Sequence, residues 1–277
     1  MSVLRDILAP SRKTEIVDIG ANPIDGDPPY AAMLSAGLCR VTGFEPQPEA
    51  LARLQELKGP NERYLGHAIG DGTTAELKVC AASGMSSLLE PMEKGLGFFN
   101  LFPEFGRVEK RLPVSTRTLD SIEDVAQMDL LKIDIQGGEP AVFRNADRLL
   151  ADAVAVHTEV SFVPLYEGQP TIGDIDAELR QRGFLPHCMP ALKKWPISPC
   201  VINGNPRLGL NQLLEADIVY VRGLLDLPDL EAEALKQIAM IAHHCYGSFD
   251  LSLRCLKVLE ARGEIEAGGA DRYLTSA

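Results

Sequence analysis

The sequence lacks long apolar runs, and its first residues lack the features of a targeting peptide. A membrane-spanning helix needs about 18 or more consecutive apolar residues, and no run in the 277 residues approaches that length. The amino-terminal segment is short and includes an acid, Asp6, whereas a signal peptide has a positively charged start and a longer apolar stretch. We therefore expect neither a membrane span nor a signal peptide.

Paired cysteines and positive charge are also scarce. None of the six cysteines forms a C-x-x-C pair, so we expect reduced thiols in a cytoplasmic protein and no zinc site. The net charge of −12 is opposite to the basic surface that nucleic-acid binding requires. With 45% hydrophobic residues, the chain can bury one large core, or one core and a small appendage. The composition agrees with a cytoplasmic enzyme that has no nucleic-acid partner.

The most informative segment is 129–139, DLLKIDIQGGE. A short apolar run that ends in an acid and glycines is typical of a buried parallel strand. The last residues of such a strand point into the crevice where open α/β sheets bind ligands. Lys132 and Asp134 share one face of this strand and can pair. A charged residue in a buried strand either has an ion-pair partner or serves a function. A purely structural Lys132–Asp134 bridge is therefore the alternative to a functional site.

Two strands near the start indicate a nucleoside-bearing cofactor. Residues 15–22, EIVDIGAN, form a strand that contains Asp18 and runs into a turn. In that turn, Gly20 lets the backbone approach a ligand without a Cβ in the way. The next strand, 40–45, ends in Glu45, whose carboxylate can accept both hydroxyls of a ribose.

The turn after the first strand favours S-adenosylmethionine over NAD. A dinucleotide fold uses G-x-G-x-x-G to cradle a pyrophosphate, but Asn22 and Asp25 occupy the places of the second and third glycines. The following prolines remove N–H donors, and the acids Asp25 and Asp27 would repel a diphosphate. A ligand with sulfonium and ammonium groups suits this turn better.

An ordered series of motifs across residues 14–222 resembles the FkbM family of class I, S-adenosylmethionine-dependent methyltransferases. The matching stretches are 17–22 (VDIGAN), 43–46 (GFEP), 68–71 (AIGD), 86–88 (SSL), 118–120 (TLD) and 129–139. The chain departs from the family pattern at Gln136, where an acid is usual, and at Gly138, where alanine is usual. It also inserts residues 23–29 before the first helix.

The resemblance and the alternation of strands and helices both imply an α/β fold: a Rossmann-like, doubly wound class I methyltransferase sheet, mostly parallel, with an antiparallel last strand. We expect a methyltransferase domain over 1–223 and a C-terminal helical extension over 224–277 that forms a hairpin. The hairpin has two ordinary uses, packing on the sheet domain or forming a homodimer. The expected strands lie near 15–19, 40–45, 63–69, 75–80, 108–115, 129–135, 153–160, 184–192 and 216–221, and the helices of the sheet domain near 30–36, 47–57, 140–150 and 171–182.

Methyl transfer to a neutral hydroxyl needs alignment and a general base. Asp134 is our first candidate for the base, and Glu159, at the end of the strand near 153–160, is the second. The same two residues are a weaker alternative as ligands of a divalent metal, whose presence stays open. His157 shares strand parity with Glu159 and has a pKa suited to base work, although a buried neutral histidine is the alternative. Lys132 would orient Asp134.

The cofactor is expected to contact Asp18, Gly20, Asn22, Glu45, Ala68, Asp71 and Asp134. Ala68 and Asp71 would flank the adenine, unless Asp71 only shapes its turn. For the acceptor we expect Tyr166 and Gln169, unless they only cap the helix that begins at Thr171. The phenylalanines of the loop 95–106 either cover the substrate or fill a local core.

The sequence therefore predicts an S-adenosylmethionine-dependent methyltransferase. The resemblance implies O-methylation of a hydroxyl on a sugar, a glycan or a polyketide-type metabolite. An NAD(P)-dependent oxidoreductase of Rossmann type is the alternative within enzymes. A non-catalytic, cofactor-binding protein that interacts through its C-terminal hairpin is the alternative outside them.

Overall fold

The computed structural model describes residues 3–21 and 26–276. The predicted cofactor contact at Asn22 lies outside the described residues. No helix within these two ranges is both long enough and apolar enough to cross a membrane.

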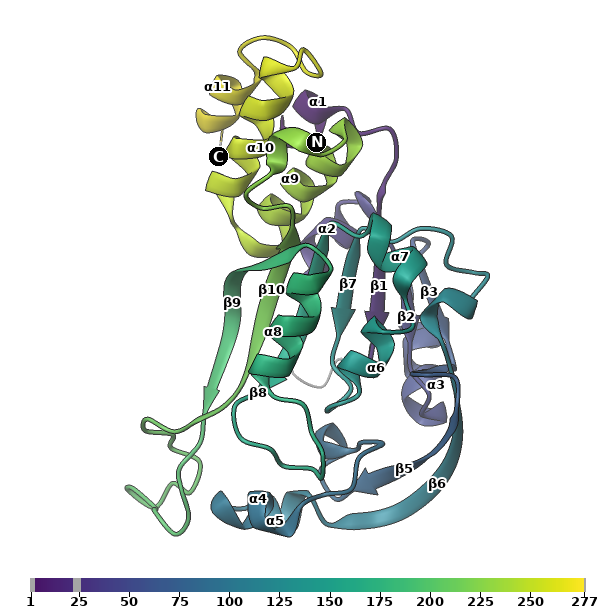
Figure 1. Ribbon diagram of the computed structural model, residues 1–277, viewed down its shortest axis with the longest axis vertical. Coiled ribbons are helices and arrows are strands. Elements are labelled where there is room, and N and C mark those ends of the chain that lie inside the picture. Colours follow the sequence, from purple (N-terminus) through teal and green to yellow (C-terminus); the bar gives the residue numbers. More distant parts are fainter. Residues whose placement is uncertain (1–2, 22–25, 277) are drawn as a thin grey trace.

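A seven-stranded sheet forms the centre of the molecule (Figure 1). Its order is β3-β2-β1-β7-β8-β10-β9, and β10 runs antiparallel to both of its neighbours while the other pairs are parallel. The strands are β1 (Thr14–Ile19), β2 (Cys39–Phe44), β3 (Glu62–Leu65), β7 (Leu130–Ile133), β8 (Ala155–Ser161), β9 (Phe184–Lys194) and β10 (Leu213–Arg222). The order reverses at β1, as in doubly wound folds, so the predicted fold with an antiparallel last strand is confirmed.

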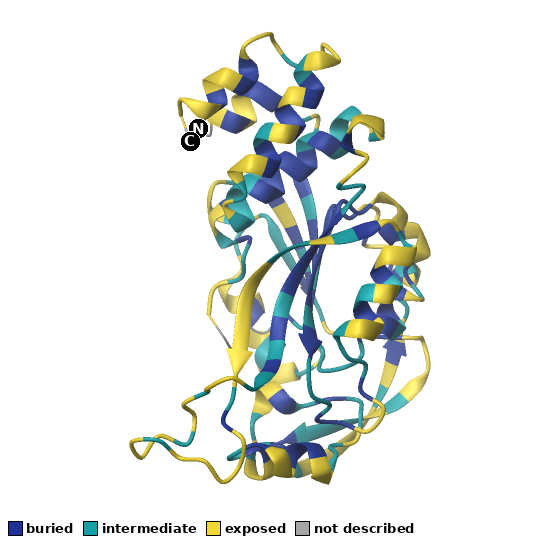
Figure 2. Cartoon of the chain, turned by 60° about the vertical axis from the view of Figure 1, so that its left-hand side comes forward, coloured by how far each residue is buried: buried dark blue, intermediate teal, exposed yellow. Residues whose placement is uncertain are grey.

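The central strands are covered by other elements on both faces of the sheet. Apolar side chains therefore point to both faces. One core joins Val17, Leu131 and Val156 to the helices that follow β7 and β8. Figure 2 shows the buried centre of the sheet and the exposed C-terminal half of the edge strand β9. The helices beside the sheet are α2 (Ala31–Ser35), α3 (Pro48–Leu57), α6 (Glu139–Phe143), α7 (Asp147–Asp152) and α8 (Ile172–Gln181).

The second core joins the C-terminal helices to the sheet. The predicted hairpin is present as α9 (Ala232–Tyr246) and α10 (Phe249–Ala261), followed by α11 (Gly269–Leu274) and joined by α1 (Val3–Leu8) from the other end of the chain. Leu235, Ile238 and Ala242 pack with Leu130 and Val219 of the sheet. The hairpin therefore packs on the sheet domain, while its use in a homodimer and the boundary near residue 223 stay predictions.

A smaller, three-stranded sheet lies beyond the carboxyl ends of the main strands (Figure 1). It consists of β4 (Ala68–Ile69), β6 (Val108–Arg117) and β5 (Thr74–Cys80) in that order. The connection between β5 and β6 carries α4 (Glu93–Phe98) and α5 (Phe102–Phe105). The C-terminal helices occupy the opposite end of the molecule.

Two predicted elements are divided in the structure. The strand expected near 63–69 is β3 in the main sheet and β4 in the small sheet. The helix expected near 140–150 is α6 and α7, because the Asn145 side chain bonds the Ala141 carbonyl at 2.8 Å and so competes with the helical pattern. Asp120 then accepts the amides of Arg148 and Leu149 and begins α7 afresh.

Candidate active-site cleft

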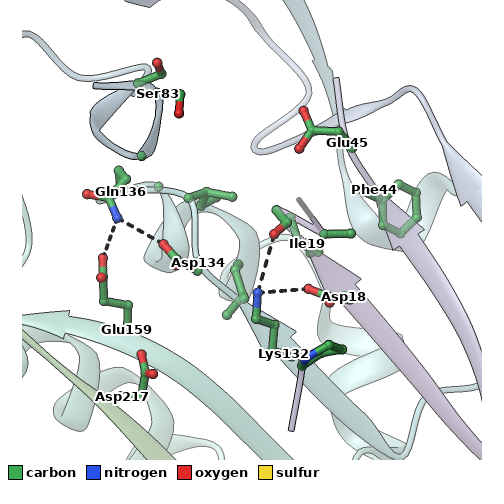
Figure 3. Close-up of a pocket in the computed structure, with 18 of the residues that line it drawn as sticks. Asp18, Ile19, Phe44, Glu45, Ser83, Lys132, Asp134, Gln136, Glu159 and Asp217 are labelled. Atoms are coloured by element: carbon green, nitrogen blue, oxygen red, sulfur yellow. Dashed lines mark hydrogen bonds and ion pairs between the residues drawn. The ribbon is translucent and has the colours of Figure 1, made fainter. Parts of the chain in front are cut away.

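Polar side chains from four neighbouring strands lie on one face of the sheet. Residues that are in register on adjacent strands point to the same face. Asp18 is in register with Lys132, and Lys132 with His157. Glu159 is in register with Asp217 on β10. All five line one cleft of about 1190 Å³, and Figure 3 shows four of them with the residues around them.

Lys132 pairs with Asp18 and not, as the sequence suggested, with Asp134. The Lys132 Nζ lies 3.2 Å from Asp18 Oδ1 and 3.4 Å from the Gly20 carbonyl (Figure 3). Tyr30 donates its hydroxyl to Asp18 Oδ2 at 2.6 Å. Burial lowers the pKa of Lys132, but the charges of Asp18 and Asp134 outweigh it and raise the pKa above its ordinary value. Strand parity gave the correct face, and the nearer carboxylate comes from the neighbouring strand.

Gln136 connects the two predicted catalytic carboxylates. Its Nε2 donates to Asp134 Oδ1 at 3.1 Å and to Glu159 Oε2 at 2.8 Å (Figure 3). Burial raises the pKa of Glu159 well above its ordinary value, and the nearby charges of Asp134 and Glu215 add to that rise. One side-chain amide thus holds the two carboxylates close to each other, and Glu159 is the one with a raised pKa.

A tight turn after β7 places Gln136 between these carboxylates. Gln136 has φ of 56° and Gly137 has φ of 102°, and side chains rarely adopt this left-handed region. Glu139 stabilises the turn by accepting the amides of Ile135 at 2.9 Å and Gly137 at 3.0 Å. Ser87 donates to the Gln136 carbonyl at 2.7 Å. The strained turn is therefore bonded from both sides.

The pH dependence of stability is expected to report on Glu139. Burial raises the pKa of this carboxyl to about 7 from its ordinary 4.5, so the folded protein holds the proton more tightly than the unfolded chain. The stabilisation is complete below pH 4.5 and is lost as the pH rises through about 7. The free energy of unfolding should fall by about 3 kcal/mol over this range. Urea unfolding at several pH values should show this fall, and the fall should be smaller by that amount in Glu139→Gln. An equal pH dependence in both proteins would contradict the assignment.

His157 lies on the cleft floor between two further residues. Its Nδ1 is 3.1 Å from the hydroxyl of Tyr246, and its Nε2 is 3.6 Å from Asp217 Oδ2. The side chain is buried, with 5% of its surface exposed. His157 is therefore a buried histidine that also lines the cleft, and its role as a base stays a prediction.

The cofactor side of the cleft contains most of the predicted contacts. Gly20, Glu45 and Ala68 all line it. Burial raises the pKa of Glu45, although its Oε1 accepts the Gln47 amide at 2.8 Å. The fold requires Gly20 as well, because a Cβ there would lie 2.1 Å from the Asp134 carbonyl, and the predicted approach of a ligand to this glycine stays a prediction.

Asp71 lies outside this cleft. It is exposed, and its Oδ1 accepts both the amide of Thr73 at 2.9 Å and the Thr73 hydroxyl at 2.6 Å. These bonds lower the pKa of Asp71. The predicted adenine contact is therefore replaced by the turn chemistry that was its alternative.

The side of the cleft where the acceptor is predicted to bind has aromatic side chains along one wall and acids on its floor. Phe102, Phe105 and Trp195 line it, and Phe102 meets Trp195 edge to face with ring centroids 5.1 Å apart. Phe99 is buried beneath them. Phe99, Phe102 and Phe105 thus belong to a local core, and the last two also face the cleft, whereas Phe98 is exposed.

Tyr166 and Gln169 are buried and do not line the cleft. Tyr166 is fully buried and donates to the Met85 carbonyl at 2.8 Å. Gln169 accepts the Leu165 amide at 2.6 Å and donates to Ser161 Oγ at 2.7 Å. Neither side chain is among the residues that line the cleft, so the predicted acceptor contacts need correction: their polar atoms are used within the protein.

Residues on β10 were missed by the sequence interpretation. Glu215 and Asp217 line the cleft, although their strand was recognised only as an element of the sheet. The alternation of acids with apolar residues over 214–219 (LEADIV) was the available signal. Across residues 3–21 and 26–276, no three His, Cys, Asp or Glu side chains are arranged to hold a metal ion.

Comparisons with known proteins assign the chain to a family. A sequence model described as "Methyltransferase FkbM domain" matches residues 18–186. The 2-O-methyltransferase NoeI of Sinorhizobium fredii is 27% identical over 189 residues, which cover 61% of this chain and 73% of NoeI.

Among solved structures, two methyltransferases show weaker similarity. The precorrin-6y C5,15-methyltransferase of Geobacter metallireducens is 12% identical, with a TM-score of 0.34 over 79% of this chain and 87% of that one. A SAM-dependent methyltransferase of Aquifex aeolicus is 8% identical, with a TM-score of 0.34 over 78% and 87% of the two chains. The strand order of the chain itself establishes the fold.

Proposed function

Because this chain belongs to the FkbM family of methyltransferases, we propose that it transfers a methyl group from S-adenosylmethionine to a hydroxyl of a sugar, a glycan or a polyketide-type metabolite. One observation carries the proposal: the paired carboxylates Asp134 and Glu159 lie on the floor of the cleft whose other half holds Asp18 and Glu45. The similarity to NoeI, a 2-O-methyltransferase, supports a hydroxyl acceptor.

The cofactor half of the cleft fits S-adenosylmethionine. Glu45 can accept the ribose hydroxyls, and Asp18 has a buried Oδ1 that receives no well-oriented hydrogen bond from the residues described. The acids Asp18 and Asp134 favour a positively charged ligand over a diphosphate. When bound, S-adenosylmethionine supplies an electrophilic methyl group on its sulfonium.

Asp134 and Glu159 divide the proton chemistry between them. Burial and the charge of Asp134 keep the proton on Glu159, so Asp134 is the carboxylate of the pair that is ready to accept a proton from the acceptor hydroxyl. Gln136 holds both carboxylates in this arrangement. A buried carboxyl with a raised pKa beside a second carboxylate is typical of acid–base sites.

The proposal is tested by product formation. The protein is incubated with tritiated S-adenosylmethionine and a panel of methyl glycosides and polyhydroxylated aromatics, and methylated products are separated and counted. Titration calorimetry with S-adenosylhomocysteine and NAD is run in parallel. Binding of NAD alone would favour the oxidoreductase, and binding of S-adenosylhomocysteine without any product across the panel would favour a non-catalytic role.

Loss of the Glu45 carboxylate is expected to weaken cofactor binding. Hydrogen bonds to a charged group contribute roughly 1.5–3 kcal/mol, so Glu45→Ala should lower the affinity for S-adenosylhomocysteine at least about tenfold. Asp71→Ala is the matched control, because it removes a carboxylate near the end of the next strand but outside the cleft. Equal affinities in the Glu45→Ala variant and the wild type would show that the ribose binds elsewhere.

A further inference from the structure

Tyr246 brings the C-terminal helices to the floor of the cleft. It is the last residue of α9 and lies outside the segment that matches the FkbM domain. Its hydroxyl is 3.1 Å from His157 Nδ1, and the two ring centroids are 5.8 Å apart. A residue of the helical extension is therefore in direct contact with a residue that lines the cleft.

The two nitrogens of the His157 ring face chemically different partners. Nδ1 faces the phenol of Tyr246, whereas Nε2 lies 3.6 Å from the carboxylate of Asp217. An ionised carboxylate only accepts hydrogen bonds, so its charge favours a hydrogen on Nε2. The hydrogen bond made by one ring nitrogen sets the protonation of the other. These contacts select the tautomer with Nε2–H, with Nδ1 accepting from the phenol.

The surroundings allow Tyr246 to act as the donor. Burial raises the pKa of Tyr246 well above its ordinary value, so the phenol keeps its hydrogen. Other titratable or charged groups surround the His157–Tyr246 pair on each neighbouring element. They are Lys132 of β7, Asp18 of β1, Asp217 of β10, Cys188 and His187 of β9, Glu159 of the same strand and Cys245 of α9.

We propose that the C-terminal helices complete the active site through Tyr246, which holds His157 as the Nε2–H tautomer, so that His157 offers the acceptor a hydrogen-bond donor and not a base. Tyr246 is then a positioning residue that acts through His157. The inference rests on the proposed function and assigns the extension a part in it. It also leaves the carboxylate of Asp134 as the proton acceptor.

Nuclear magnetic resonance of the full-length protein, labelled with ¹⁵N and ¹³C in histidine, tests the tautomer directly. The chain has five histidines, and His157→Gln identifies the signals of His157. Long-range ¹H–¹⁵N spectra are recorded at about pH 8.5, above the ordinary titration range of histidine. We expect hydrogen on Nε2 alone in the wild type and a mixture of both tautomers in Tyr246→Phe.

The same extension offers a matched control. Tyr273 lies with its hydroxyl 2.8 Å from His243 Nδ1, so Tyr273→Phe removes an equivalent tyrosine–histidine contact among the C-terminal helices. This variant should change the signals of His243 and leave those of His157 as they were. Hydrogen on Nδ1 of His157 in the wild type overturns the proposal even if Tyr246→Phe fails to fold, and so does an unchanged tautomer in a folded Tyr246→Phe protein.

Turnover separates a donor from a base at His157. Glutamine keeps an N–H donor but cannot take up a proton, whereas leucine keeps neither. With tritiated S-adenosylmethionine and the methyl glycosides of the panel above, His157→Gln should be about threefold to tenfold more active than His157→Leu, as expected for one hydrogen bond. Equal losses of about 10²-fold or more in both variants would show a base. If the wild type does not bind S-adenosylhomocysteine, the proposed function is refuted, whereas the result on the tautomer is unaffected.

Discussion

Asp134→Asn is expected to lower methyl transfer by about 10² to 10⁴, the range for loss of a general base. The affinity for S-adenosylhomocysteine should be kept, because this product lacks the sulfonium charge that Asp134 favours. Asparagine preserves the shape of the side chain and its oxygen can still accept from Gln136, which donates to Asp134 Oδ1 at 3.1 Å. The variant therefore removes the charge and the capacity to accept a proton. Initial rates with tritiated S-adenosylmethionine measure the effect.

Glu159→Gln is the matched control for this prediction. Burial favours the protonated form of Glu159, and glutamine is the neutral counterpart of that form. We expect a loss no greater than about tenfold, which corresponds to one perturbed hydrogen bond. The opposite pattern, a severe loss in Glu159→Gln and a mild one in Asp134→Asn, would transfer the role of base to Glu159. If the Asp134→Asn variant is fully active and fully stable, Asp134 has no part in the mechanism.

The positions of these carboxylates could be predicted from the sequence because the signals are local. Each of Glu45, Asp134 and Glu159 stands in or just after an apolar run that forms a parallel strand. The carboxyl ends of parallel strands meet at one edge of the sheet, so residues far apart in the sequence could be brought together without knowing any contact.

The partners of these residues could not be predicted in the same way. Strand parity gives the face of Lys132 but not which of two nearby acids is closer, and the register of β1 against β7 places Asp18 beside it. The start of α7 depends on Asp120, whose carboxylate accepts amides 28 and 29 positions later in the chain. Such a cap has no local pattern to recognise.

Polar residues in loops were the least predictable. Tyr166 and Gln169 have the composition of a substrate-binding loop, yet the loop folds back and uses their polar atoms internally. Tyr246 stands 89 positions from His157 and ends a helix whose sequence indicates only packing. Long-range contacts of this kind depend on how whole elements dock, which periodicity does not encode.

Lys132→Met is expected to destabilise the protein by roughly 3–5 kcal/mol, because it leaves a buried carboxylate without its countercharge. Asp18 has 2% of its side chain exposed and Lys132 has 18%, with 3.2 Å between Nζ and Oδ1. Methionine keeps most of the volume and none of the charge. Urea unfolding followed by circular dichroism gives the change in the free energy of unfolding.

Two further variants distinguish loss of charge balance from loss of packing. Lys257→Met breaks a pair with Asp271 in which the two side chains are 46% and 75% exposed, and exposed pairs contribute at most about 1 kcal/mol. The double variant Lys132→Met/Asp18→Asn leaves no unpaired charge, so it should recover most of the stability lost by Lys132→Met alone. If the double variant is as unstable as the single one, the loss arises from packing, and the ion pair between β1 and β7 is not what keeps Lys132 in the sheet.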